Sequence, residues 1–168
     1  MRRRPIVRAR APITAALALC ATVGFSNAWA ANTCTVASTV HAFGAYNTLT
    51  ALPGTSTITV TCTHSTAAAH TFPYTIALSS GPGTYALRQM AGSGDILTYN
   101  LYTNAAHTIV WGDGSGVTST VSGSIVVASG AGRSGFQAQT VYGLITAPQN
   151  VRAASYATTT PITVTVTY

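Results

Sequence analysis

The last part of the chain alternates between apolar and hydroxyl-bearing side chains. Ile162, Val164, Val166 and Tyr168 occupy every second position, and threonines fill the positions between them. Side chains two residues apart point to the same face of a β-strand, so this run has one apolar and one polar face. Residues 58–62 alternate in the same way, with Ile, Val and Cys separated by threonines. Both runs are therefore predicted to be half-buried β-strands.

Several other segments are rich in β-branched and aromatic residues and are also predicted to be strands. They are residues 34–42, 73–79, 84–90, 96–103, 108–111, 119–128 and 138–146. Clusters of Gly, Pro and Ser separate them, for example at 80–83 and 112–116. The chain contains no Lys and no Glu, and no window has a helical apolar stripe. The pattern predicts a single all-β domain built as a two-sheet sandwich.

The first thirty residues have the pattern of a secretory signal peptide. Arginines are concentrated in residues 1–10, an apolar stretch follows over 11–25, and Ala-Trp-Ala at 28–30 matches a small-x-small cleavage site. The apolar stretch is too short for a comfortable membrane span. We therefore expect residues 1–30 to be a signal peptide and residues 31–168 to be the mature domain. Such a domain is expected to be exported and then displayed on the cell surface or secreted.

The charge of the chain is concentrated in the predicted signal peptide. The formal net charge is +6, but the mature domain retains only Arg88, Arg133 and Arg152 against Asp95 and Asp113. A nucleic-acid-binding surface needs basic residues that neutralise phosphates. The mature domain is therefore not expected to bind nucleic acid.

The mature domain has two cysteines, Cys34 and Cys62. In an oxidising compartment an even pair indicates a disulfide, which closes a loop and restricts the unfolded chain. Two buried free thiols are the alternative. A third cysteine, Cys20, follows a bulky Leu inside the predicted signal peptide and is a poor lipidation site.

Few groups in the mature domain are suited to catalysis. Its two carboxylates, Asp95 and Asp113, lie in Gly-rich turns, where Asp is common. A glycosidase pair is the alternative interpretation, because those enzymes use two carboxylates. The Gly-Asp-Gly-Ser-Gly stretch at 112–116 supplies one carboxylate, whereas a calcium loop needs several. The domain is therefore expected to be non-enzymatic, with no small-molecule substrate.

The four histidines do not form a ligand motif. They are His41, His64, His70 and His107, and none has a metal-ligand spacing to another His, Cys or Asp. His64 and His70 flank an Ala-rich stretch and are expected to be solvated loop residues. No metal or cofactor is therefore predicted.

Short motifs follow one another along the mature domain in a recognisable order. They are Cys34-Thr35-Val36, Phe43-Gly44-Ala45-Tyr46, the strand ending at Cys62, Tyr99-Asn100-Leu101-Tyr102, Trp111-Gly112-Asp113-Gly114, Val141-Tyr142-Gly143 and the C-terminal alternating strand. In this order, after a signal peptide, they resemble the spore coat protein U domain family. That family includes subunits of archaic, Csu-like chaperone–usher pili, and the resemblance covers nearly the whole mature chain.

The resemblance implies an immunoglobulin-like sandwich that lacks its last strand. A periplasmic chaperone lends a strand to the resulting groove, and the N-terminal extension of another pilus subunit replaces it at the outer-membrane usher by strand addition. The final strand, with Ile162, Val164, Val166 and Tyr168, matches the strand that borders this groove. The cysteine pair matches the family's disulfide pattern. The implied function is a structural or adhesive pilus subunit in cell adhesion and biofilm formation.

Two features of the chain depart from the family pattern. Cleavage after Ala30 leaves three residues before Cys34, which is too short for a donor segment at about 3.3 Å per residue. Such a subunit receives a strand without giving one, which suits a terminal, tip position. Cleavage near Cys20 is the alternative, and it would restore a donor segment that contains Val23, Phe25 and Trp29. The approach to the last strand, residues 154–158, also lacks the family's Gly and Asp. The alternative hypothesis is an autonomous secreted coat or surface-binding β-sandwich.

Overall fold

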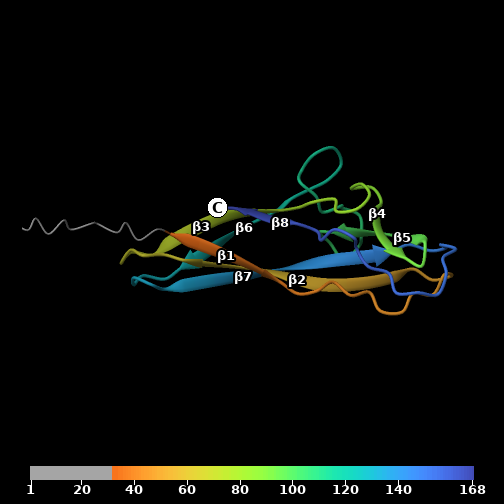
Figure 1. Ribbon diagram of the computed structural model, residues 1–168. Coiled ribbons are helices and arrows are strands. Elements are labelled where there is room, and N and C mark those ends of the chain that lie inside the picture. Colours follow the sequence, from red (N-terminus) through yellow and green to blue (C-terminus); the bar gives the residue numbers. More distant parts are fainter. Residues whose placement is uncertain (1–31) are drawn as a thin grey trace, which may run out of the picture.

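The computed structural model describes residues 32–168 as eight antiparallel strands in two sheets, with no helix among these residues. The strands are β1 (Thr33–Ser38), β2 (Leu52–Thr63), β3 (His70–Leu78), β4 (Arg88–Gly92), β5 (Asp95–Tyr102), β6 (Val121–Val127), β7 (Ser134–Ile145) and β8 (Val164–Thr167). One sheet has the order β1-β2-β7-β5-β4 and the other has the order β6-β3-β8. The predicted all-β, two-sheet sandwich is confirmed (Figure 1).

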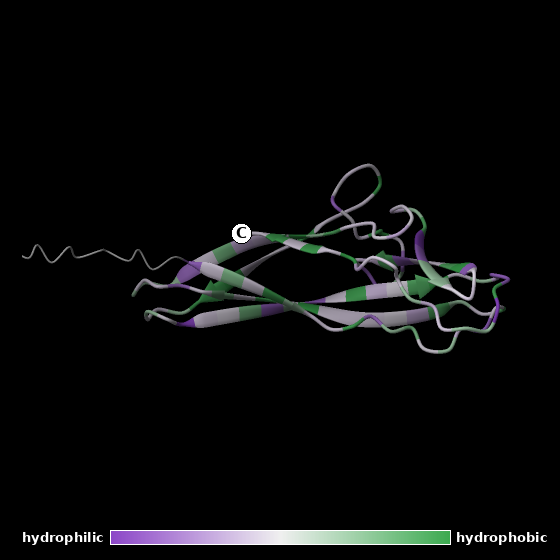
Figure 2. Cartoon of the chain, viewed as in Figure 1, coloured by the Kyte–Doolittle hydropathy of each residue, from purple (hydrophilic) through white to green (hydrophobic). Residues whose placement is uncertain are grey.

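The alternation in β2 decides which of its faces enters the core. Ile58, Val60 and Cys62 are at most 2% exposed, whereas the threonines between them point outward. The same alternation continues in the neighbouring strands and gives the banded colouring of Figure 2. Apolar side chains from both sheets therefore meet in one layer between them, as expected for a sandwich.

The two sheets differ in length, and this difference positions the site described below. β2 and β7 pair along their whole lengths, from Leu52 opposite Ile145 to Thr63 opposite Ser134. Figure 1 shows β3, β6 and β8 over one end of this long sheet, with β4 and β5 toward the other end. We call the part with two facing sheets the closed half, and the part around Gly54 and Gly143 the open half.

Polar groups also join the layers in the closed half. The Tyr74 hydroxyl on β3 donates a 2.8 Å hydrogen bond to Gln137 Oε1 and accepts one of 2.8 Å from Gln139 Nε2, both on β7. Tyr74 is only 2% exposed, so these bonds satisfy a hydroxyl that would otherwise be buried without partners.

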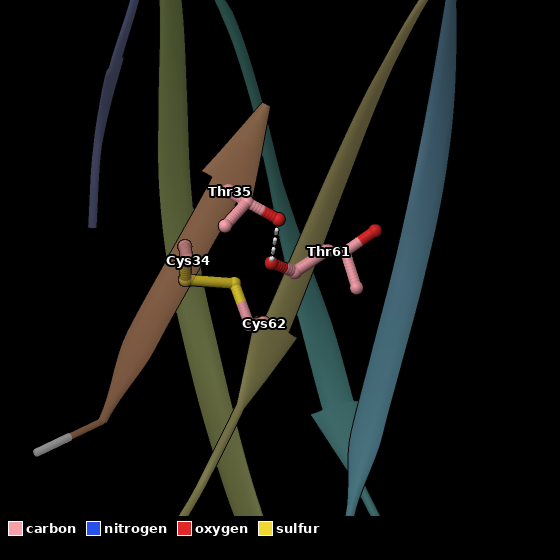
Figure 3. The surroundings of a disulfide bond; sticks show 4 residues. All are labelled: Cys34, Thr35, Thr61 and Cys62. Carbon is pink, nitrogen blue, oxygen red and sulfur yellow. Dashed lines mark hydrogen bonds between the residues drawn. A yellow bond between two sulfur atoms is a disulfide. The ribbon is translucent and has the colours of Figure 1, made fainter. Parts of the chain in front are cut away.

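The Cys34–Cys62 disulfide is present and joins β1 to β2 (Figure 3). The two cysteines are direct cross-strand partners, and Cys62 is fully buried. The bond therefore attaches the edge strand β1 to the core of the five-stranded sheet.

Three predicted strands differ from those observed. Residues 108–111 form only isolated bridges, through Val110 and Trp111, because they cross between the sheets. The segment predicted at 84–90 begins as a turn, in which Thr84 and Leu87 bond to each other, and becomes a strand at Arg88. The strand predicted at 34–42 ends at Ser38, and residues 39–42 contain no regular strand.

The predicted signal peptide, its cleavage site and Cys20 lie outside the described residues. Within the described part of the chain, no helix of sufficient length and apolar character to cross a membrane was found.

Candidate functional site

A cavity of about 290 Å³ opens between the two sheets where the first and last strands approach each other. Its floor is the inner face of the five-stranded sheet, and its rims are the residues after β1 and those that lead into β8. The lining residues are Ser38, Thr39, Val40, His41, Phe43, Ser56, Ile58, Leu78, Met90, Tyr99, Leu101, Val141, Thr158, Pro161, Ile162 and Val164. The lining is mainly apolar, and no Asp or Glu is among these residues.

A second, larger cavity of about 770 Å³ continues over the open half. It lies between residues 40–48 and residues 151–158, above Leu97 and Ile145. The two cavities share Val40, His41, Phe43, Met90 and Thr158. We call them together the groove, and the shared segment around His41 and Phe43 divides it into two compartments.

The dividing side chains rest on two opposed glycines. Gly54 on β2 and Gly143 on β7 are direct cross-strand partners. A Cβ on Gly54 would lie 3.0 Å from both His41 Nε2 and Phe43 Cδ1, and a Cβ on Gly143 would overlap the His41 ring. The absence of side chains at both positions therefore creates the flat floor on which His41 and Phe43 pack.

His41 is held on this floor by few polar contacts. Its Nδ1 shares a 2.8 Å hydrogen bond with Ser56 Oγ, whereas its Nε2 is buried without a hydrogen-bond partner. The His41 and Phe43 rings lie 4.6 Å apart, and Phe43 packs edge-on against Tyr99 at 5.6 Å. Burial lowers the pKa of His41 below its ordinary value of 6.5, because burial disfavours the charged ring.

The C-terminal strand forms one rim of the groove. Ile162 and Val164 line the first cavity, and Val166 is half-buried against the core. Tyr168 is 56% exposed and lines neither cavity. Among the described strands β8 pairs only with β3, so its other edge is unpaired. The opposite rim follows β1, which likewise pairs only with β2.

A fully buried arginine lies near the groove and was not anticipated from the sequence. Arg88 donates hydrogen bonds to Asn100 Oδ1, to the Trp111 carbonyl at 2.7 Å and to the Ser79 carbonyl at 3.1 Å. Its guanidinium carbon also lies 5.4 Å from the centroid of the Tyr85 ring. Burial lowers the pKa of Arg88, because it removes water from the charged guanidinium. No carboxylate forms a hydrogen bond with the guanidinium to replace that stabilisation.

This arginine is connected to the β8 rim through Ser79. The Ser79 hydroxyl accepts a 2.8 Å hydrogen bond from the Thr163 amide, and the Ser79 amide donates one of 3.0 Å to the Thr163 carbonyl. Arg88 therefore helps to position the approach to β8 relative to β4 and β5.

Most of the family-motif residues divide among three places. Phe43, Tyr99, Leu101 and Gly143 form the floor and divider of the groove, whereas Asn100 and Trp111 belong to the Arg88 cluster. Tyr102 and Tyr142 lie in paired positions on β5 and β7, and both rings pack edge-on against His107.

The remaining motif residues lie in turns and connections. Gly44 has a positive φ of 82°, and the Tyr46 hydroxyl donates a 2.9 Å hydrogen bond to the Thr146 carbonyl. Gly112 packs against the Thr118 side chain, and Asp113 accepts hydrogen bonds from the Ser115 amide at 2.9 Å and hydroxyl at 2.6 Å. Gly44 and Tyr46 line the second cavity, whereas Gly112 and Asp113 shape a loop outside the groove.

The two carboxylates do not share partners. Asp95 Oδ2 accepts a 2.8 Å hydrogen bond from the Arg152 amide and lies 3.9 Å from Arg152 Nε, whereas Asp113 is bonded within its own turn. Hydrogen bonds from Ser115 lower the pKa of Asp113. Neither carboxylate lines the groove.

The prediction that His64 is solvated is wrong. It is 1% exposed, and its Nε2 bonds to the Ala128 carbonyl at 2.9 Å. His70 is exposed and begins β3. Over residues 32–168, no group of three or more His, Cys, Asp or Glu side chains is arranged to hold a metal ion.

Comparison with known proteins identifies the family of this chain. The family model described as the Spore Coat Protein U domain matches residues 19–166. A search of the curated proteins found no match. The family match covers nearly all of the chain and agrees with the all-β architecture. The chain therefore belongs to the Spore Coat Protein U domain family.

Proposed function

We propose that this chain is a non-enzymatic structural or adhesive subunit of a chaperone–usher surface pilus, and that its groove accepts a β-strand from another protein. The family is a pilus-type structural family, and its members are associated with surface or pilus structures. The observation that carries the proposal is the apolar groove between two unpaired strand edges, at β1 and β8.

Strand addition suits this geometry for a physical reason. An unpaired edge offers backbone amides and carbonyls to an incoming strand, and the groove offers an apolar floor for its alternate side chains. Ile58, Leu101 and Val141 form such a floor, and Val164 contributes from the edge strand itself. A single inserted strand would therefore both pair with the free backbone edge and cover the exposed part of the core.

The partners proposed are a periplasmic chaperone, an outer-membrane usher and other pilus subunits. The chaperone strand would occupy the groove during export, and a subunit strand would replace it at the usher. If cleavage follows Ala30, the mature chain has no donor segment of its own. We therefore propose a terminal position in the pilus, at its tip.

A native mass spectrum of the protein from its own periplasm tests this proposal. We expect an oxidised chain that begins at Ala31 and is held one-to-one by a second protein. A stable free monomer or homo-oligomer would contradict strand acceptance.

A pair of variants in β8 makes the test specific to the groove. Val164→Asp places a carboxylate over the apolar floor, whereas Thr165→Asp places it on the exposed face of the same strand. We expect the first variant to lose the bound partner and the second to keep it. Val164→Thr, a milder change of similar shape, is expected to weaken capture while leaving the oxidised fold intact.

An autonomous secreted coat or surface-binding domain is the second candidate. The observation in its favour is that residues 40–48 and 151–158 already cover part of the open half. The mass spectrum separates the candidates, because an autonomous domain needs no strand from a partner.

A further inference from the structure

We propose that His41 and Phe43 form an acid-sensitive divider, which leaves the floor of the groove when His41 is protonated and joins the two cavities into one continuous channel. This inference describes regulation of the strand-accepting site and rests on the proposed function for its consequence. The movement itself is a property of this chain alone.

The positions along β7 show why the divider controls the length of the groove. Val141 lines the first cavity and Ile145 lines the second, while Gly143 lies between them beneath His41. Removing the His41 and Phe43 side chains from this place would uncover Gly143 and its partner Gly54. The two cavities would then share one uninterrupted floor along β2 and β7.

The segment that carries the divider has few hydrogen bonds to the rest of the domain: Thr39 bonds to Thr57, His41 to Ser56 and Tyr46 to the Thr146 carbonyl. Residues 39–50 contain no regular strand. The Thr39 amide donates a 2.9 Å hydrogen bond to the Thr57 carbonyl, and beyond Thr39 the segment leaves the edge of the sheet. Val40 and Leu49 are 87% and 81% exposed, so their side chains add little packing to the segment. His41, Phe43 and Tyr46 supply the inward contacts, and of these only His41 changes charge near neutral pH.

A protonated His41 has two N–H donors, and the one on Nε2 would have no acceptor in this place. The buried Nε2 faces the Gly143 backbone, and Ser56 already occupies Nδ1. The titratable and charged groups around the groove are Tyr99 on β5, Tyr46 on the divider segment, and Arg152 and Tyr156 on the segment after β7. β2 and β7 contribute none, no carboxylate lines either cavity, and Arg152 carries the same charge as a protonated histidine.

The direction of the pH effect follows from these contacts. The His41 pKa in the closed arrangement lies below its ordinary value of 6.5, so the released segment binds the proton more readily than the closed one. The closed arrangement is therefore fully favoured above pH 6.5. Its advantage decreases as the pH falls through the lowered pKa.

The sequence provides a matched control for this histidine. His41-Ala42-Phe43 and His70-Thr71-Phe72 are both His-x-Phe segments, and their ring centroids lie 4.6 Å and 4.5 Å apart. His70 is exposed at the start of β3 and lines neither cavity. His41→Asn retains a group that can bond to Ser56 but cannot titrate, and His70→Asn is its control.

Amide hydrogen exchange tests the proposal on the oxidised protein from its periplasm, with any bound partner retained. Protection factors for residues 39–46, corrected for intrinsic exchange, are compared at pH 7.5 and pH 5.0. We expect a loss of protection at pH 5.0 in the wild type and in His70→Asn, no loss in His41→Asn, and unchanged protection of residues 58–63 throughout. Equal protection of residues 39–46 at both pH values in the wild type would overturn the proposal.

A second measurement needs no variant. The ring resonances of His41, followed by NMR against pH in the wild-type protein, are expected to titrate below 6.5. Titration at or above 6.5 would contradict the divider mechanism, because protonation would then favour the closed arrangement. Strand capture at pH 7.5 is measured separately. If the pH-dependent movement of the divider is not observed, the proposal that the groove accepts a strand is therefore unaffected.

Discussion

The two halves of the sandwich cover the same long sheet in different ways. In the closed half, β3 and β6 lie over β2 and β7, and Phe72, Tyr74 and Ile125 are nearly inaccessible to solvent. In the open half, irregular segments replace the second sheet and the larger cavity remains beneath them, while the smaller cavity adjoins it between the two sheets. The same sheet therefore has a closely packed core at one end and a partly uncovered core at the other.

This difference separates the residues that stabilise the fold from those that are available for binding. Closely packed apolar side chains in the closed half stabilise the fold, because removing one leaves a void that its neighbours cannot fill. The open half contributes less to stability, but its floor and unpaired edges can accept another strand. Changes in the closed half should therefore affect unfolding, and changes in the open half should affect binding and local opening.

The largest effect is expected from Phe72→Ala in the closed half. Phe72 is 4% exposed, and truncation of a buried Phe typically lowers the free energy of unfolding by about 3–5 kcal/mol. Phe43→Ala in the open half removes a half-buried ring, for which about 1 kcal/mol is expected. Urea unfolding measures both values, and equal losses would remove the distinction between the halves.

A somewhat smaller effect is expected when the disulfide is removed. Cys34 and Cys62 are 28 residues apart, and closing such a loop contributes about 3.5 kcal/mol in the chain-entropy model. The double substitution of both cysteines by Ala should lower the unfolding free energy by about this amount. Reduction of the wild-type protein is the matching control, and an unchanged urea midpoint in both cases would show that β1 does not depend on this bond.

A local effect is expected from a methyl group added beneath the divider. Gly143→Ala places a Cβ where the His41 ring lies, so residues 39–46 should lose amide protection even at pH 7.5. Gly135→Ala, also on β7, meets Ile125 and Val126 in the closed half and is the control. It should lower the stability to urea without exposing residues 39–46. A divider that stays protected in Gly143→Ala would mean that the glycine floor is not needed for its packing.

The smallest effect is expected at Asp113. Ser115 holds the pKa of this carboxylate below its ordinary value of 3.8, so the resulting stabilisation is present above pH 3.8 and lost as the pH falls through the lowered value. Asp113→Asn should therefore reduce the acid sensitivity of the 112–116 turn and leave the groove unchanged. Acid titrations followed by NMR compare the variant with the wild type. A change in groove protection would show that this turn and the groove are coupled.

The parts of the fold that follow from local alternation could be predicted from the sequence. The apolar positions of residues 58–62 and 162–168 point toward the core or groove, except for the exposed Tyr168, and Cys34 and Cys62 are bonded to each other. β7 shows the limit of such patterns. In its first half Phe136 is 73% exposed, while Gln137 and Gln139 face inward and bond to Tyr74. Because the polar side chains face inward here, the apolar pattern of a strand is absent, and the predicted strand began only at residue 138.

The parts that depend on distant contacts could not be predicted. Gly54 and Gly143 form the floor only because the β2–β7 register places them opposite each other. His41 is a buried divider only because that floor exists. Arg88 is buried because Asn100, Trp111 and Ser79, from three different parts of the chain, supply its hydrogen-bond acceptors. No local pattern distinguishes these residues from exposed ones.

Strand acceptance at the groove requires the free edge of β8 to pair with a strand from another protein. Amide exchange of β8 tests it most directly, measured in the partner-bound protein and again after the partner is removed. We expect the partner to protect amides within Val164–Thr167, while the exchange of β6, at the opposite edge of the same sheet, does not change. Equal exchange of β8 with and without the partner would contradict strand acceptance at the groove.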